Sequence, residues 1–124
     1  MPLVLFALLS ACGTPVVGAL PEGVYGSPDI GLRVDATGRA VFERSCYQGD
    51  LGIVDVVDGS FVAEFRWVRT GGDPPLDTGA DAGTPATVDA TASTTLIEGT
   101  ITSEGDEQDL HLVFGREPTY FECP

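Results

Sequence analysis

The sequence predicts one small all-β domain, an antiparallel up-and-down barrel or sandwich of seven to eight strands. Several stretches alternate apolar and polar residues with the period of two that half-buried strands show. Clusters of Asp, Gly and Ser separate these stretches at short intervals, which is typical of hairpin turns. No stretch sustains a helical period, and 124 residues are the length of one domain. The many short connections favour the barrel over the sandwich.

The clearest predicted strand covers residues 61–69, between a turn at Asp58-Gly59 and a Gly-rich segment. Phe61, Phe65 and Trp67 fall on one face of this strand, which makes that face the predicted centre of the core. If the barrel is open at one end, the same three side chains would line a pocket for a small apolar ligand. The other expected strands cover residues 30–34, 40–47, 51–57, 95–102, 109–114 and 119–123.

Residues 70–94 consist almost entirely of Gly, Asp, Pro, Ala and Thr. This composition predicts a long, mobile acidic loop inserted in the β domain. Residues 76–81 resemble the active-site loop of retroviral-type aspartic proteases, but the flanking glycines and prolines favour a solvated linker. The aspartates of the loop do not have the spacing of an EF-hand calcium site. The sequence therefore predicts no catalytic residue, metal site or cofactor.

An apolar run over residues 3–9 is followed by small residues and a cysteine. The stretch Leu9-Ser10-Ala11-Cys12 resembles the lipobox of bacterial lipoproteins, which implies cleavage before Cys12 and attachment of lipid to it. Residues 1–11 are then the signal peptide, 12–21 the lipidated cysteine and a disordered tether, and 22–124 the β domain. The apolar run is too short to span a membrane. The resemblance implies a cell-envelope protein, and Gly13 implies sorting to the outer membrane.

The chain has three cysteines. Lipidation of Cys12 would leave Cys46 and Cys123 as an even pair in a compartment that permits disulfides. Their disulfide would close a loop of roughly 78 residues, for which the chain-entropy model gives about 4–5 kcal/mol of stabilisation.

Turn glycines and cysteines recur in an order similar to that of small, uncharacterised exported β domains of bacteria. The residues that carry this resemblance are Gly23-x-Tyr25-Gly26, Gly38-x-Ala40, Cys46-x-x-Gly49-x-Leu51, Asp58-Gly59-x-Phe61, Arg116-x-Pro118 and Cys123. The resemblance implies the fold and a disulfide, but no activity.

The chain has 19 acidic and 6 basic residues and a net charge of −13. Such a charge repels nucleic acid and anionic lipid headgroups, and leaves a basic protein or metal cations as possible partners. His111 is the only histidine and is predicted to lie on the outer face of its strand, which favours a surface residue over a catalyst.

The expected function is a non-enzymatic, lipid-anchored envelope lipoprotein that binds a partner or has a structural role. One alternative is a lipocalin-like carrier of a small apolar ligand. Another is an inhibitor of a basic hydrolase such as lysozyme. An aspartic protease is a third and weaker hypothesis.

Overall fold

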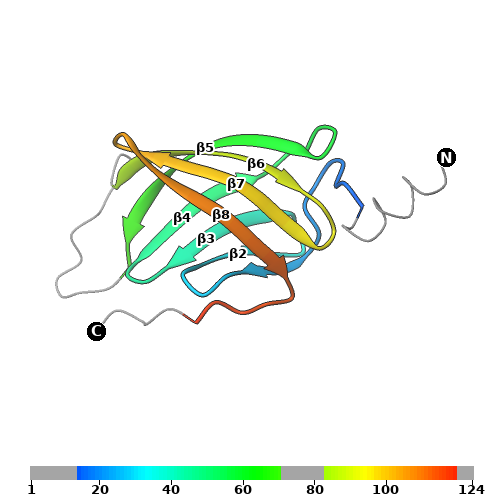
Figure 1. Cartoon of the computed structure of the whole chain (residues 1–124), viewed down its shortest axis with the longest axis horizontal. Coiled ribbons are helices and arrows are strands. Elements are labelled where there is room, and N and C mark those ends of the chain that lie inside the picture. The colour runs from blue at the N-terminus through cyan, green and yellow to red at the C-terminus, as the bar shows by residue number, and fades with distance from the viewer. Residues whose placement is uncertain (1–13, 71–82, 120–124) are drawn as a thin grey trace.

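The computed structural model describes residues 14–70 and 83–119, which form one closed β-barrel (Figure 1). Each strand pairs antiparallel with the next along the chain, and β1 pairs with β8 to close the barrel. The strands are β1 (Gly23–Gly26), β2 (Ile30–Val34), β3 (Arg39–Arg44), β4 (Tyr47–Ile53), β5 (Ser60–Arg69), β6 (Thr84–Ala92), β7 (Leu96–Ser103) and β8 (Asp106–Phe114). The prediction of an all-β up-and-down barrel is confirmed. Within the described ranges, no helix is long and apolar enough to cross a membrane.

Large and small side chains alternate between neighbouring strands inside the barrel. On β5 the predicted core residues are Phe61, Phe65 and Trp67, and all three are buried. Phe61 pairs with Ala90 of β6, and Phe65 pairs with Ala86. The small alanines leave the volume that the aromatic rings fill, so the lumen is packed with side chains. The largest fully buried side chains are those of Trp67, Tyr25, Phe42, Ile30, Leu32, Ile97 and Leu112.

The prediction of a long loop over residues 70–94 is wrong for the second half of this range. Residues 84–92 form β6, which pairs along its length with β5 and with β7. Ala86, Val88, Ala90 and Ala92 point inward and are buried. The strand was missed because its inward residues are nearly all alanine, and its apolar pattern is therefore weak.

The predicted strand over residues 40–47 is also wrong, because a tight turn divides it. β3 ends at Arg44, and β4 begins at Tyr47 opposite it. Cys46 lies in the turn with a φ of 70°, the left-handed region that non-glycine residues seldom adopt. Residues 48–50, which lie between the two predicted strands 40–47 and 51–57, are part of β4 instead. A Cβ at Gly49 would lie 2.6 Å from Cδ2 of Phe65, so this glycine makes room for the aromatic core.

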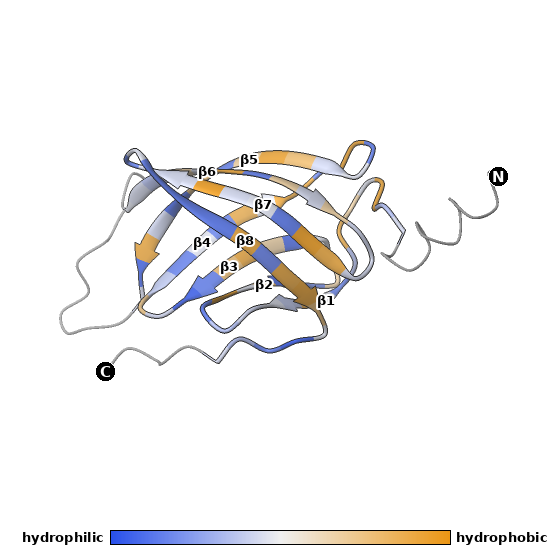
Figure 2. Ribbon diagram, in the orientation of Figure 1, coloured by the Kyte–Doolittle hydropathy of each residue, from blue (hydrophilic) through white to orange (hydrophobic). Residues whose placement is uncertain are grey.

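One end of the barrel is covered by residues 14–20, and we call it the closed end. Val16 and Leu20 are buried in the core, together with Val54 and Val56 of the segment after β4. Gly18 and Val56 exchange two backbone hydrogen bonds of 2.8 Å, and the amide of Val16 donates to the carbonyl of Ala92. The prediction of a disordered tether over residues 12–21 is therefore wrong for residues 14–20. Figure 2 shows hydrophobic stretches in this part of the chain, where the N-terminal segment meets the barrel.

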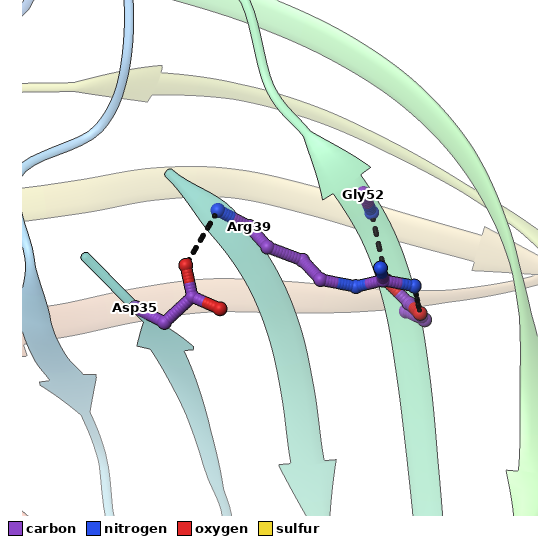
Figure 3. A network of polar contacts seen from close by, with 4 residues as sticks. Asp35, Arg39 and Gly52 are labelled. Atoms are coloured by element: carbon purple, nitrogen blue, oxygen red, sulfur yellow. Dashed lines mark hydrogen bonds and ion pairs between the residues drawn. The ribbon is translucent and has the colours of Figure 1, made fainter. Parts of the chain in front are cut away.

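A polar network fixes the hairpin between β2 and β3 and the end of β4 (Figure 3). The Asp35 carboxylate accepts hydrogen bonds from the amides of Thr37 and Arg39, at 2.9 and 3.1 Å. The Arg39 guanidinium forms an ion pair with Asp50, which also accepts a 2.8 Å hydrogen bond from the amide of Gly52. These contacts hold the strand ends where the ladder between β3 and β4 shifts register.

After β8 the chain turns back across the outside of β1 and β2. A Cβ at Gly26 would lie 2.0 Å from the carbonyl oxygen of Arg116, so only glycine allows this crossing. Glu117 forms an ion pair of 2.7 Å with Arg33. The Thr119 hydroxyl donates a 3.5 Å hydrogen bond to the carbonyl of Pro28, in the turn between β1 and β2.

Candidate functional site

The end of the barrel opposite the closed end is hollowed, and we call it the open end. A hollow of about 270 Å³ lies there, lined by the end of β3, the turn of the β7–β8 hairpin with the strand residues beside it, and the facing ends of β4, β5 and β6. Its lining residues are Arg44, Tyr47, Trp67, Thr84, Ile101, Ser103, Glu104, Asp106, Glu107 and Gln108. The buried ring of Trp67 is part of this lining and links the hollow to the aromatic core.

Arg44 is the central side chain of the open end. Its guanidinium carbon lies 4.1 Å from the centre of the Trp67 ring and 5.0 Å from the centre of the Tyr47 ring. Stacking of this kind stabilises a cation by about 0.5–2 kcal/mol, depending on how dry the site is. Burial lowers the pKa of the Arg44 guanidinium, and the charge of Tyr47 offsets part of this effect.

Among the described residues, one hydrogen bond engages the Arg44 guanidinium. Nη1 donates a long 3.4 Å hydrogen bond to Oε1 of Gln108. Among residues 14–70 and 83–119, no carboxylate lies within ion-pair distance of Arg44. The rim of the same hollow carries Glu104, Asp106 and Glu107, all exposed. The open end therefore combines one stacked cation with three solvated carboxylates, which suits polar recognition of a partner.

The three aromatic residues predicted to line a ligand pocket are core residues in the described structure. Phe65 and Trp67 pack edge to face with ring centres 5.1 Å apart, and both contact Phe42. Trp67 also forms part of the lining of the open-end hollow. Phe61 is buried near the closed end, opposite Ala90. Their role in holding a ligand remains a prediction.

A second hollow, of about 880 Å³, lies along the outer side of β4, β5 and β6. It forms where β4 and β5 separate, because these strands pair only from Tyr47 to Gly49. Its lining mixes the charges of Asp50, Glu64 and Arg66 with apolar side chains such as Val68. The groove has no cluster of groups that would suit catalysis.

The predicted lipid site and half of the predicted disulfide lie outside the described residues. Cys12 precedes Thr14, the first described residue, and Cys123 follows Thr119, the last one. Cys46 lies in the turn between β3 and β4, at the open end. The disulfide between Cys46 and Cys123 therefore remains a prediction. The aspartic-protease-like residues 76–81 also lie outside the described ranges.

The remaining titratable residues do not form a reaction centre in the described structure. His111 is exposed on β8, as predicted, and its Nδ1 lies 3.4 Å from Oε2 of Glu98 on β7. Within residues 14–70 and 83–119, no group of three His, Cys, Asp or Glu residues is placed to hold a metal ion. Asp89, predicted in the acidic loop, is an exposed residue of β6 instead.

The role of Arg44 was not predicted from the sequence, although the signal was present. Phe42 and Arg44 occupy alternate positions of one strand, so a charged residue follows an aromatic one on the inward face. A charge on an inward face indicates a strand end or a binding site. Comparison of the chain with models of protein families, with curated proteins and with solved structures found no match.

Proposed function

We propose that the protein is a non-enzymatic lipoprotein of the bacterial cell envelope, anchored through lipid on Cys12, which binds a partner at the open end. The observation that carries the partner-binding proposal is the packed lumen with one polar, hollowed end. A carrier of small apolar ligands needs an interior cavity, whereas here aromatic side chains fill the lumen beneath Arg44. The hollow above them is lined by charged and polar groups, which suit a polar surface.

The charge of the chain supports a basic protein as the partner. The net charge is −13, and three exposed carboxylates lie on the hairpin between β7 and β8, at the rim of the open end. The negative electrostatic potential of such a surface attracts a basic protein and speeds its association, most strongly at low salt. A basic hydrolase such as lysozyme fits this description, and its inhibition is the specific form of the proposal that can be tested first.

A disulfide between Cys46 and Cys123 belongs to the same proposal. The hydrogen bond from Thr119 to Pro28 brings the end of the described chain to the turn between β1 and β2. Ile30, which follows that turn, pairs with Arg44, two residues before Cys46. Cys123 is four positions after Thr119, and this stretch of chain spans at most about 14 Å. This span suits a disulfide that ties the C-terminus to the open end.

Two measurements test the proposal. Mass spectrometry of the full chain purified from bacterial membranes should find acyl chains on an N-terminal Cys12, and Cys12→Ser should release the protein from the membrane. Binding to a basic lysozyme should weaken at high salt and should weaken further when Glu104 and Glu107 are changed to glutamine. Glu98→Gln, on the outer face of β7, is the matched control and should bind normally. An unacylated protein, or binding that ignores both salt and the open-end charges, would refute the proposal.

A further inference from the structure

The closed end of the barrel presents a patch of exposed apolar side chains. Val17 is 76% exposed and Val57 is 62% exposed. They lie opposite each other, one position beyond the hydrogen-bonded pair of Gly18 and Val56. Because Val16 and Val56 are buried, the alternation of an extended chain places Val17 and Val57 together on the outer face.

The patch continues from Val17 to the end of β4. Ala19 lies two residues after Val17 and is likewise exposed on the outer face of the N-terminal segment. A Cβ at Gly38 would lie 3.5 Å from Cβ of Ala19 and 3.9 Å from Cγ2 of Ile53, so these two side chains flank the same point. Ile53 is 70% exposed. We call Val17, Ala19, Ile53 and Val57 the closed-end patch.

The described part of the chain begins at this same end, with Thr14. Two hydrogen bonds fix Thr14 to Thr94. The amide of Thr14 donates a 3.2 Å bond to the Thr94 hydroxyl, and the carbonyl of Thr14 accepts a 2.9 Å bond from the amide of Thr94. Cys12 lies two residues before Thr14, a distance of at most about 7 Å along an extended chain. Lipid on Cys12 would therefore insert into a membrane right beside the closed-end patch.

We infer that the closed-end patch rests on the lipid surface in which the acyl chains of Cys12 are inserted, with the open end directed away from the membrane. This inference rests on the proposed lipid anchor. Apolar side chains buried at the interface add to the membrane binding that the acyl chains provide, because binding strength scales with buried apolar area. A second copy of the chain is a poorer occupant, because stable interfaces bury about 800 Å² per partner and this patch has four small or medium side chains.

Among the described residues, the unpaired charges beside the patch indicate the kind of lipid, since Arg39, opposite Ile53, is already ion-paired with Asp50. Asp55 lies opposite Ala19, Asp58 follows Val57, and both are exposed. These carboxylates repel anionic headgroups but tolerate neutral, zwitterionic ones. The surface that fits is therefore a leaflet of phosphatidylethanolamine or phosphatidylcholine.

Fluorescence quenching in vesicles tests the orientation. The full acylated chain is reconstituted into phosphatidylcholine vesicles with and without brominated acyl chains, which quench nearby tryptophans. Val57→Trp should lose emission and shift to shorter wavelength in brominated vesicles. Thr102→Trp is the matched control, since Thr102 is exposed on β7 at the open end, and it should keep its emission. The native Trp67 is buried at that end and gives the unquenched baseline.

Each outcome decides the inference. Equal emission from acylated Val57→Trp in the two kinds of vesicle would mean that the barrel stands away from the membrane, which refutes the orientation but leaves the anchor intact. If the Val57→Trp emission shifted to shorter wavelength without quenching, and the shift grew with protein density, the patch would bind a second copy of the chain. This result would also refute the orientation. Quenching that persists unchanged in phosphatidylglycerol vesicles would refute the choice of neutral lipid. Absence of acyl chains in mass spectrometry would refute the anchor and the inference together.

Discussion

Replacing Leu20 by alanine tests whether the N-terminal segment belongs to the folded barrel. Leu20 is 3% exposed, so Leu20→Ala removes buried atoms from the core at the closed end. The lost transfer free energy, at about 0.8 kcal/mol for each buried methylene, is near 2.4 kcal/mol, and a cavity adds to it. Leu20→Ala should therefore lower the free energy of unfolding by about 2–5 kcal/mol, a large part of the 5–15 kcal/mol typical of a domain.

The matched control is Val17→Ala, three residues earlier in the same segment. Val17 is exposed, so its truncation should change the free energy of unfolding by less than about 0.5 kcal/mol. Urea unfolding followed by the emission of the single tryptophan, Trp67, measures both variants at the far end of the barrel. If Leu20→Ala lowered the free energy of unfolding no more than Val17→Ala does, residues 14–20 would be detached in solution. The description of these residues as the cover of the closed end would then be wrong.

Three further predictions concern the core, a buried tyrosine and the proposed disulfide. Gly49→Ala should cost about 1–3 kcal/mol in urea unfolding, because its Cβ would lie 2.6 Å from Phe65; a neutral result would contradict this packing. Burial raises the pKa of Tyr25 to about 12 from its ordinary value of 10.0. As pH rises, Tyr25 therefore loses its proton in the unfolded chain before it does so in the folded protein. The contribution of Tyr25 to the free energy of unfolding should thus be fully present below pH 10 and be lost as pH rises towards 12. A Tyr25→Phe variant that kept the same pH dependence would show that Tyr25 is not its cause. Cys46→Ser should cost about 4–5 kcal/mol under oxidising conditions, and the double variant with Cys123→Ser should cost no more; additive losses would disprove the pairing.

The sequence was informative where hydrophobic alternation was strong. β5 was predicted almost to its ends, because Phe61, Phe65 and Trp67 alternate with polar residues and Asp58-Gly59 marks the preceding turn. The barrel itself followed from the number of simple hairpins. Residues 84–92 were missed because alanine has little strand preference alone. Their inward alanines become decisive only beside the aromatic rings of β5, which is a property of the pair of strands.

Turn chemistry misled the prediction near Cys46 for a related reason. Gly49 and Asp50 suggested a turn by composition, yet Gly49 provides space beneath Phe65, and Asp50 pairs with Arg39 across the ladder. The real turn contains Ser45 and Cys46, without the glycine that usually adopts a positive φ. The role of Arg44 was equally hidden, since a stacked guanidinium requires Tyr47 and Trp67 to meet at one end of the barrel.

The height of the barrel sets how far the open end would stand from a membrane that touches the closed end. β5 has 10 residues. At a rise of about 3.3 Å per residue and a tilt of about 40°, its height along the barrel axis is roughly 25 Å. Because residues 14–20 pack on the barrel, the proposed anchor at Cys12 would add little to this reach. A membrane-bound partner would have to extend about 25 Å to reach Arg44, whereas a soluble basic protein would meet the open end without obstruction, and this difference favours the soluble partner.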